Sequence, residues 1–101
     1  MRIPRKHVDR INDLIKMREA HFYMADRTEE EANEATDFVT VTTLRMDAIN
    51  WKISAHKYAI KLFEETGIEI DGIDVNRTKL AVLNDRFDRL AEILESVTEA
   101  A

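Results

Sequence analysis

The segment at residues 28–66 carries two separate apolar seams and contains neither Gly nor Pro. In both seams the residues follow one another at alternating spacings of three and four, the pattern of a helix that packs by heptads. The first seam comprises Ala32, Ala35, Val39, Thr42, Met46, Ile49, Ile53, His56, Ile60 and Phe63, and the second comprises Val41, Leu44, Ala48, Trp51, Ala55, Tyr58 and Leu62. At about 100° per residue the seams lie about 160° apart around one helix. A helix that is apolar on two sides needs cover on both, so the pattern predicts a long central helix sandwiched by other elements.

Capping signals predict where the helices begin and end. Thr28 and Glu31 form a Ser/Thr-x-x-Glu capping box, and Gly67 follows as a natural C-cap, which places the central helix at about 28–66. Pro4 suits the first turn of a preceding helix at about 5–25. After a connector at 67–74, a further apolar seam predicts a third helix at about 75–98. The first and third helices are therefore expected to be about half as long as the central one.

The composition supports one all-α domain that covers 1–101. Only two residues are Gly and one is Pro, while 35% are charged, and such a composition favours long helices. We therefore expect a three-helix arrangement around one long central helix, with coiled-coil-like or bundle packing. The chain has no Cys, which excludes disulfides and thiolate sites. No apolar stretch approaches the roughly 20 residues of a membrane span, so a cytoplasmic protein is the default expectation.

The two seams of the central helix also predict a partner. Short outer helices could each cover one seam in part, which gives a self-contained monomer, or both could share one side and leave the second seam to another chain. The second arrangement is favoured here, because the second seam would otherwise form a large apolar patch in water. Trp51 and Tyr58 lie one heptad apart on it, as aromatic anchors of an interface do. The predicted partner interface consists of Val41, Leu44, Trp51, Tyr58 and Leu62, and the expected partner is a protein, most simply a second copy in a homo-oligomer.

Two polar residues on apolar faces are candidates for specificity or switching. Arg18 lies between Ile15 and Phe22 on the apolar face of the first helix. A buried guanidinium needs a carboxylate, so Arg18 pairs with an Asp or Glu of another helix, which we favour, or binds a partner's carboxylate or an anionic ligand. His56 occupies a seam position. We favour a hydrogen-bonded core histidine there, and the alternative is a pH switch or anion site on the axis of a symmetric bundle.

No catalytic, cofactor or metal motif stands out. A Glu-x-x-His pair, as a di-iron bundle requires, does not occur, and neither does a Gly-rich phosphate loop. The net charge of −5 argues against binding nucleic acid through the phosphate backbone. We therefore expect a non-enzymatic protein without cofactor or metal. Its small size and acidic balance suit an accessory factor of a phage or bacterium, such as an inhibitor, adaptor, chaperone or virion component.

An acidic nucleic-acid mimic is one alternative function. Acidic residues cluster on the central and third segments, where they could together present a DNA-like array of charges, as small mimic inhibitors do. These residues are Glu29, Glu30, Glu31, Glu34 and Asp37 in the first group and Asp85, Asp88, Glu92, Glu95 and Glu99 in the second. Arg86 and Arg89 interrupt the second group. The favoured interpretation is therefore that these are ordinary solvated helix faces.

A nucleotide pyrophosphatase is the other alternative. The segment Glu30-Glu31-x-x-Glu34 resembles the first half of the magnesium motif of the MazG-type all-α nucleotide pyrophosphatases. This resemblance covers a handful of residues and implies magnesium-dependent hydrolysis of a nucleotide. The family's motif continues with Glu-x-x-Asp on the following helix, whereas this chain offers only Glu92-x-x-Glu95, far along the sequence.

Overall fold

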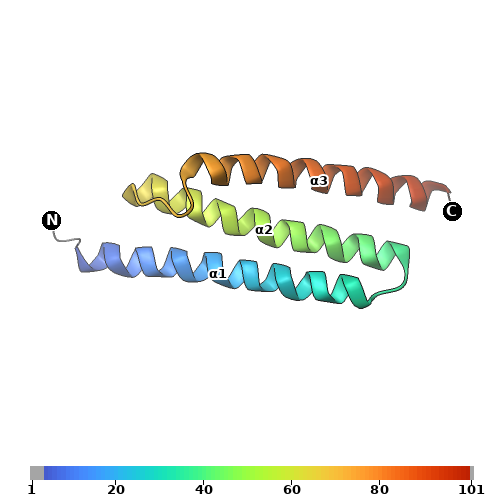
Figure 1. The fold of residues 1–101 in the computed structure, drawn as a ribbon, viewed down its shortest axis with the longest axis horizontal. Coiled ribbons are helices and arrows are strands. Elements are labelled where there is room, and N and C mark those ends of the chain that lie inside the picture. The colour runs from blue at the N-terminus through green and yellow to red at the C-terminus, as the bar shows by residue number, and fades with distance from the viewer. Residues whose placement is uncertain (1–3, 101) are drawn as a thin grey trace.

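A computed structural model describes residues 4–100 and consists of three helices of nearly equal length. They are α1 (Arg5–Glu34), α2 (Phe38–Thr66) and α3 (Ile73–Ala100); residues 1–3 and 101 lie outside the described part of the chain. α2 lies between α1 and α3 and packs against both, whereas α1 and α3 do not approach each other within 4–100 (Figure 1). The predicted all-α fold, in which two helices pack on either side of a central one, is confirmed.

The predicted boundary between the first two helices is wrong. α1 continues to Glu34, and the chain turns at 35–37 instead of near residue 27. Thr28 was expected to cap the central helix, but it lies inside α1, where its hydroxyl donates a hydrogen bond to the carbonyl of Met24 at 2.7 Å. α1 therefore has 30 residues and α2 has 29, so the outer helices are as long as the central one.

Asp37 sets the start of α2. Its carboxylate accepts hydrogen bonds from the backbone N–H of Thr40 at 2.9 Å and from the hydroxyl of Thr40 at 3.0 Å. These bonds satisfy a backbone donor that has no partner within the first turn of a helix. Asp37 thus supplies the capping that the sequence analysis assigned to Thr28.

The buried face of α1 explains why that helix does not stop at residue 28. Leu14, Ala25, Thr28 and Ala32 are buried, and they follow the spacing of one helix face. Ala32 is therefore part of the α1 face and not of the α2 seam. The heptad phase continues across the turn, so the spacing of apolar residues alone does not locate the break.

α2 buries two sides, as its two seams predicted. Its buried residues are Thr42, Ala48, Ile53, Ala55, His56, Ala59 and Leu62. On one side Trp51 and Tyr58 contact His21 of α1. On the other side His56 bonds to Asn76 of α3. One helix of the same chain therefore covers each seam.

The connector between α2 and α3 is folded back onto the helices. Gly67 ends α2 in the left-handed conformation, with φ of 75°, and its N–H donates to the carbonyl of Phe63 at 2.7 Å. Asn76 is 2% exposed, and its amide nitrogen donates to the carbonyls of Ile70 at 2.6 Å and Gly72 at 2.8 Å. One side chain in the first turns of α3 thus holds the connector.

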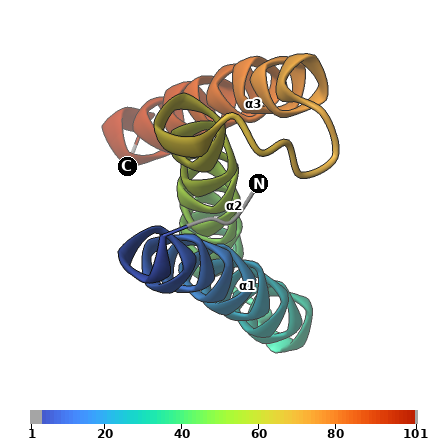
Figure 2. The ribbon, with the colours of Figure 1, turned by 90° about the vertical axis from the view of Figure 1, so that its left-hand side faces the viewer.

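The three helices form an elongated layer. Seen end on, α1, α2 and α3 lie in one row (Figure 2). The Cα radius of gyration is 16.7 Å, whereas a compact domain of this length has about 13 Å. The accessible surface is 7046 Å², compared with about 5,900 Å² for a compact monomer of this mass. None of the helices within 4–100 has the length and hydropathy that a bilayer span requires.

The capping role of Asp37 predicts a specific loss of stability. Asp37→Ala lowers the melting temperature at pH 7, because the N–H of Thr40 loses its acceptor. The hydrogen bonds from Thr40 hold the pKa of Asp37 below its ordinary value of 3.8. The carboxylate therefore stabilises the fold fully above that ordinary value, and the contribution is lost as the pH falls through the lowered pKa. Thermal unfolding followed by circular dichroism at pH 7 and at acidic pH measures both effects.

Asp37→Asn is the matched control for this prediction, because an asparagine caps a helix without ionising. It should retain most of the stability at pH 7 and should lack the acid-dependent part. Equal melting temperatures for Asp37→Ala and the wild type at pH 7 would contradict the capping role.

Candidate binding grooves

The structure has a hollow on each face of the helix layer, and the first lies between α1 and α2. This α1/α2 groove has a volume of about 480 Å³ and is lined by Met24, Thr28, Glu31, Leu44, Asp47, Asn50, Trp51 and Ser54. Met24 is 39% exposed, and Leu44 and Trp51 are half-buried. The groove therefore presents apolar side chains to solvent among polar ones.

Leu44 and Trp51 of the predicted interface line this groove, and Tyr58 lines a smaller hollow further along α2. The ring of His21 lies between Trp51 and Tyr58, with ring centroids 5.0 and 5.1 Å away and edge-to-face geometry. Val41, Leu44, Trp51 and Tyr58 are half-buried. Leu62 is 1% exposed and belongs to the core, so it is not available to a partner. α1 of the same chain thus covers part of the seam that the sequence assigned to another chain, because α1 is longer than predicted.

Charges are separated along the same face of the layer. Glu31 and Asp47 line the α1/α2 groove. Further along α2, Lys57 and Lys61 line a smaller hollow of about 180 Å³ together with Ser54 and Tyr58. One end of the face is therefore acidic and the other basic, with Ser54 shared between them.

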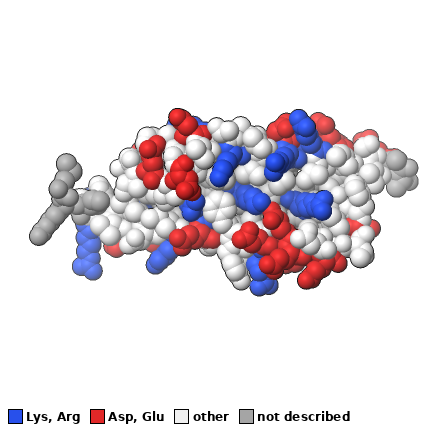
Figure 3. Space-filling model, viewed as in Figure 1, with Lys and Arg blue, Asp and Glu red and all other residues white. Residues whose placement is uncertain are grey.

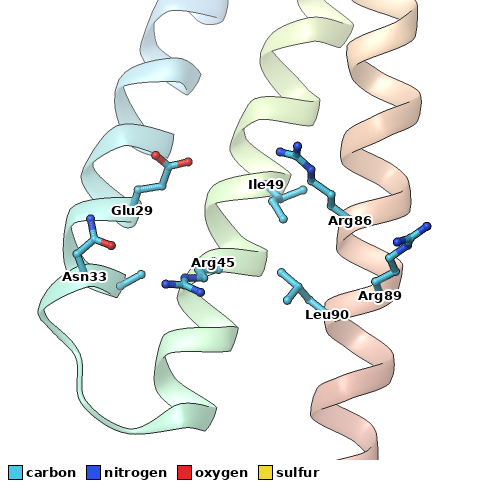
Figure 4. Close-up of a pocket in the computed structure, with 8 residues that line it drawn as sticks. Glu29, Asn33, Arg45, Ile49, Arg86, Arg89 and Leu90 are labelled. Atoms are coloured by element: carbon cyan, nitrogen blue, oxygen red, sulfur yellow. The ribbon is translucent and has the colours of Figure 1, made fainter.

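The second hollow lies on the opposite face and involves all three helices. This three-helix groove has a volume of about 470 Å³ and is lined by Glu29, Ala32, Asn33, Arg45, Ile49, Arg86, Arg89 and Leu90. Figure 4 shows side chains from α1 on one wall, from α3 on the other, and from α2 between them. Arg45 and Asp47 are about 160° apart around α2 at about 100° per residue, which places the two grooves on opposite faces.

The three-helix groove combines an apolar floor with a cationic rim. Ala32 is buried, and Ile49 and Leu90 are half-buried. Two other charges near the groove are neutralised, since Glu29 forms an ion pair with Lys52 and Arg89 bonds to Asp85 at 2.9 Å. Within 4–100, neither Arg45 nor Arg86 has a carboxylate at ion-pair distance.

A further hollow continues this face toward the connector. It has a volume of about 410 Å³ and is lined by Arg18, Phe22, Lys52, His56, Asp71, Thr78, Lys79, Val82, Leu83 and Arg86. Arg18 bonds to Asp71 at 2.7 Å, and its guanidinium carbon lies 4.8 Å from the ring centroid of Phe22. The carboxylate that pairs with Arg18 thus comes from the connector, whereas the predicted partner was an Asp or Glu of another helix.

His56 is part of a buried polar cluster. Its Nδ1 lies 2.9 Å from Oδ1 of Asn76, and its ring meets Phe22 edge-on at 5.2 Å. Because the amide nitrogen of Asn76 already donates to two carbonyls, the Oδ1 atom accepts from Nδ1–H, which fixes the histidine tautomer. The contact therefore joins α2 to α3, and a switching role for His56 stays a prediction.

The carboxylates of the two alternative functions are not assembled into one site. Within the described residues, no group of three or more His, Asp or Glu side chains is placed to hold a metal ion. Glu30, Glu31 and Glu34 lie on α1, whereas Glu92 and Glu95 lie on α3, on the other side of α2. The two acidic groups of the mimic hypothesis are separated in the same way.

Comparison with family models, with curated proteins and with solved structures finds no match to this chain. The two grooves and the charges around them are the features of this chain that bear on its function.

The His56–Asn76 contact predicts a measurable coupling between α2 and α3. Asn76→Ala removes a buried hydrogen-bond partner from His56 and from two carbonyls, and should cost about 1–3 kcal/mol in the free energy of unfolding. Asn84→Ala, at an exposed position of α3, is the control and should stay within about 0.5 kcal/mol of the wild type. Urea unfolding measures both variants. Equal losses at the two positions would show that the buried cluster contributes nothing specific.

Proposed function

We propose that this protein is a non-enzymatic interaction protein that self-associates through the face carrying the α1/α2 groove. Met24, Leu44 and Trp51 form the apolar centre of the contact, and Tyr58 lies beside them. The proposal retains three of the interface residues predicted from the sequence, which are Leu44, Trp51 and Tyr58. It omits Val41, which lines neither hollow of this face, and Leu62, which the core encloses. Met24 is added because it lines the groove and is exposed.

The surface area of the single chain is the observation that carries this proposal. The chain exposes about 1,100 Å² more than a compact monomer of its mass. A standard-size protein interface covers about 800 Å² on each partner. The apolar part of this surface, which includes Met24 at 39% exposed, is stabilised when a second layer covers it.

The charge separation on this face supports an antiparallel, two-fold dimer. In such an interface, residue i of one chain contacts residue j of the other, and j contacts i. Asp47 precedes Ser54 by seven residues, and Lys61 follows Ser54 by seven. A two-fold axis near Ser54 therefore brings Asp47 of each chain to Lys61 of the other, and the opposite charges set the orientation of the pair.

A self-associating helical protein with this acidic balance suits the role of a small accessory factor of a phage or bacterium. Such factors act as inhibitors, adaptors, chaperones or virion components. They act through a stable binding surface and require no catalytic site. The assembly would supply that surface by rigidifying the helix layer.

Self-association predicts a solution mass of twice the 11.8 kDa of one chain. Met24→Glu introduces a charge into the groove and should weaken the dimer at least tenfold, because the charge is desolvated on association. Sedimentation equilibrium over a wide concentration range measures the dissociation constant. The matched control is Tyr23→Glu, one residue away on the outer side of α1, where Tyr23 is 59% exposed; this variant should dimerise like the wild type.

A charge exchange tests the orientation of the pair. Asp47→Lys and Lys61→Asp should each weaken the dimer, and the two together should restore it. A wild-type chain that stays monomeric at every concentration would exclude self-association. Equal weakening by Met24→Glu and Tyr23→Glu would exclude this face as the interface.

A further inference from the structure

The three-helix groove gathers positive charge on a protein whose net charge is −5. Figure 3 shows Lys and Arg side chains gathered over α2 and α3 in the middle of this face, with Asp and Glu side chains over α1, along the outer edge of α3 and in the left part of the view. Arg45 and Arg86 have no carboxylate partner within 4–100. Both residues are exposed at the rim of the groove. Their charges are therefore available to an anionic group from outside the molecule.

The groove also has an apolar floor between two separate walls. It runs over α2 between α1 and α3, which do not close over it. A fourth helix placed there would complete a four-helix arrangement, with apolar contacts to Ile49 and Leu90. α3 extends the apolar strip on this side, because Val82 and Ile93 are 45% and 47% exposed. Val82 lines the adjoining hollow, and Ile93 follows Arg86 by two helical turns.

We infer that the three-helix groove binds an acidic amphipathic α-helix of a partner protein. The apolar face of that helix packs on Ile49, Leu90 and Val82, in the helix-in-groove mode of recognition. The carboxylates that flank this apolar face accept charge-assisted hydrogen bonds from the guanidinium groups of Arg45 and Arg86. Charge complementarity thus selects an acidic helix over a neutral or basic one.

Two other occupants fit the groove less well. A second copy docked by two-fold symmetry through this groove would bring the unpaired charges of Arg45 and Arg86 in one chain near the same charges in the other. A single-stranded nucleic acid needs aromatic side chains on which its bases stack, and the residues that line the three-helix groove within 4–100 include no Phe, Tyr or Trp. The proposal is independent of the self-association above, because the two grooves lie on opposite faces.

Synthetic helices test this inference directly. The probe is a labelled heptad peptide with Leu at the a and d positions and Glu at the e and g positions. Repulsion between the Glu side chains of two peptides disfavours the formation of a peptide dimer. The full-length protein should bind this peptide in a salt-sensitive manner, as measured by fluorescence anisotropy. Arg45→Glu combined with Arg86→Glu should weaken binding at least tenfold, while helicity by circular dichroism stays unchanged.

The controls separate recognition by the groove from general charge attraction. Arg27→Glu combined with Arg77→Glu makes the same charge change at exposed positions outside both grooves and should leave binding within about twofold of the wild type. The same peptide with Lys at the e and g positions, and a labelled oligothymidine, should not bind. Absence of binding by the Glu peptide, or equal loss in both double variants, would overturn the inference. Oligothymidine binding that the groove variant abolishes would assign the groove to nucleic acid instead.

Discussion

The burial of both sides of α2 is the constraint on which the rest of this structure depends. Because α2 is apolar toward both neighbours, α1 and α3 are placed on different sides of it and make no close approach to each other within 4–100. A three-helix bundle usually closes around one shared core, whereas here the core is divided between two interfaces. His21 between Trp51 and Tyr58 belongs to the α1–α2 interface, and the hydrogen bond between His56 and Asn76 belongs to the α2–α3 interface. The ring of His56 also meets Phe22 of α1, so this residue contacts both outer helices. The open layer and its two grooves are consequences of this division.

The two faces of the layer differ in their chemistry, although the same three helices make them. The face that carries the α1/α2 groove has acidic side chains in that groove and lysines in the smaller hollow further along α2, a distribution that complements itself under a two-fold rotation. The three-helix groove carries one sign of free charge over an apolar floor, a distribution that complements a different molecule. One face thus suits a second copy, as proposed above, and the other suits a different molecule.

The seams of α2 were sufficient to predict the fold class, because a helix with two apolar sides has few arrangements open to it. They were not sufficient to locate the turn. Thr28 and Asp37 both offer a capping side chain, and the alanines between them fit the apolar face of either helix. The decision depends on tertiary packing, in which Thr28 and Ala32 are buried on α1.

The same error in the position of the turn affected the candidate site. With a short first helix, Trp51 and Tyr58 were expected to lack cover within the chain, whereas the longer α1 brings His21 against both rings. The cationic groove was missed for another reason, because Arg45 and Arg86 lie far apart in sequence and on different helices. The sequence did indicate positive charge at this place, because Arg86 and Arg89 interrupt the acidic residues of α3. Their convergence with Arg45 depends on how α3 packs against α2, which periodicity does not specify.

Distance measurement between paired spin labels on α1 and α3 tests the open layer most directly, when it is recorded on a variant in which single chains prevail. Because α2 lies between α1 and α3, the open layer predicts that the axes of these two helices are separated by about twice the usual packing distance of about 8–10 Å. A separation of only about 8–10 Å would mean that α1 and α3 close over α2, and neither groove would then exist as described.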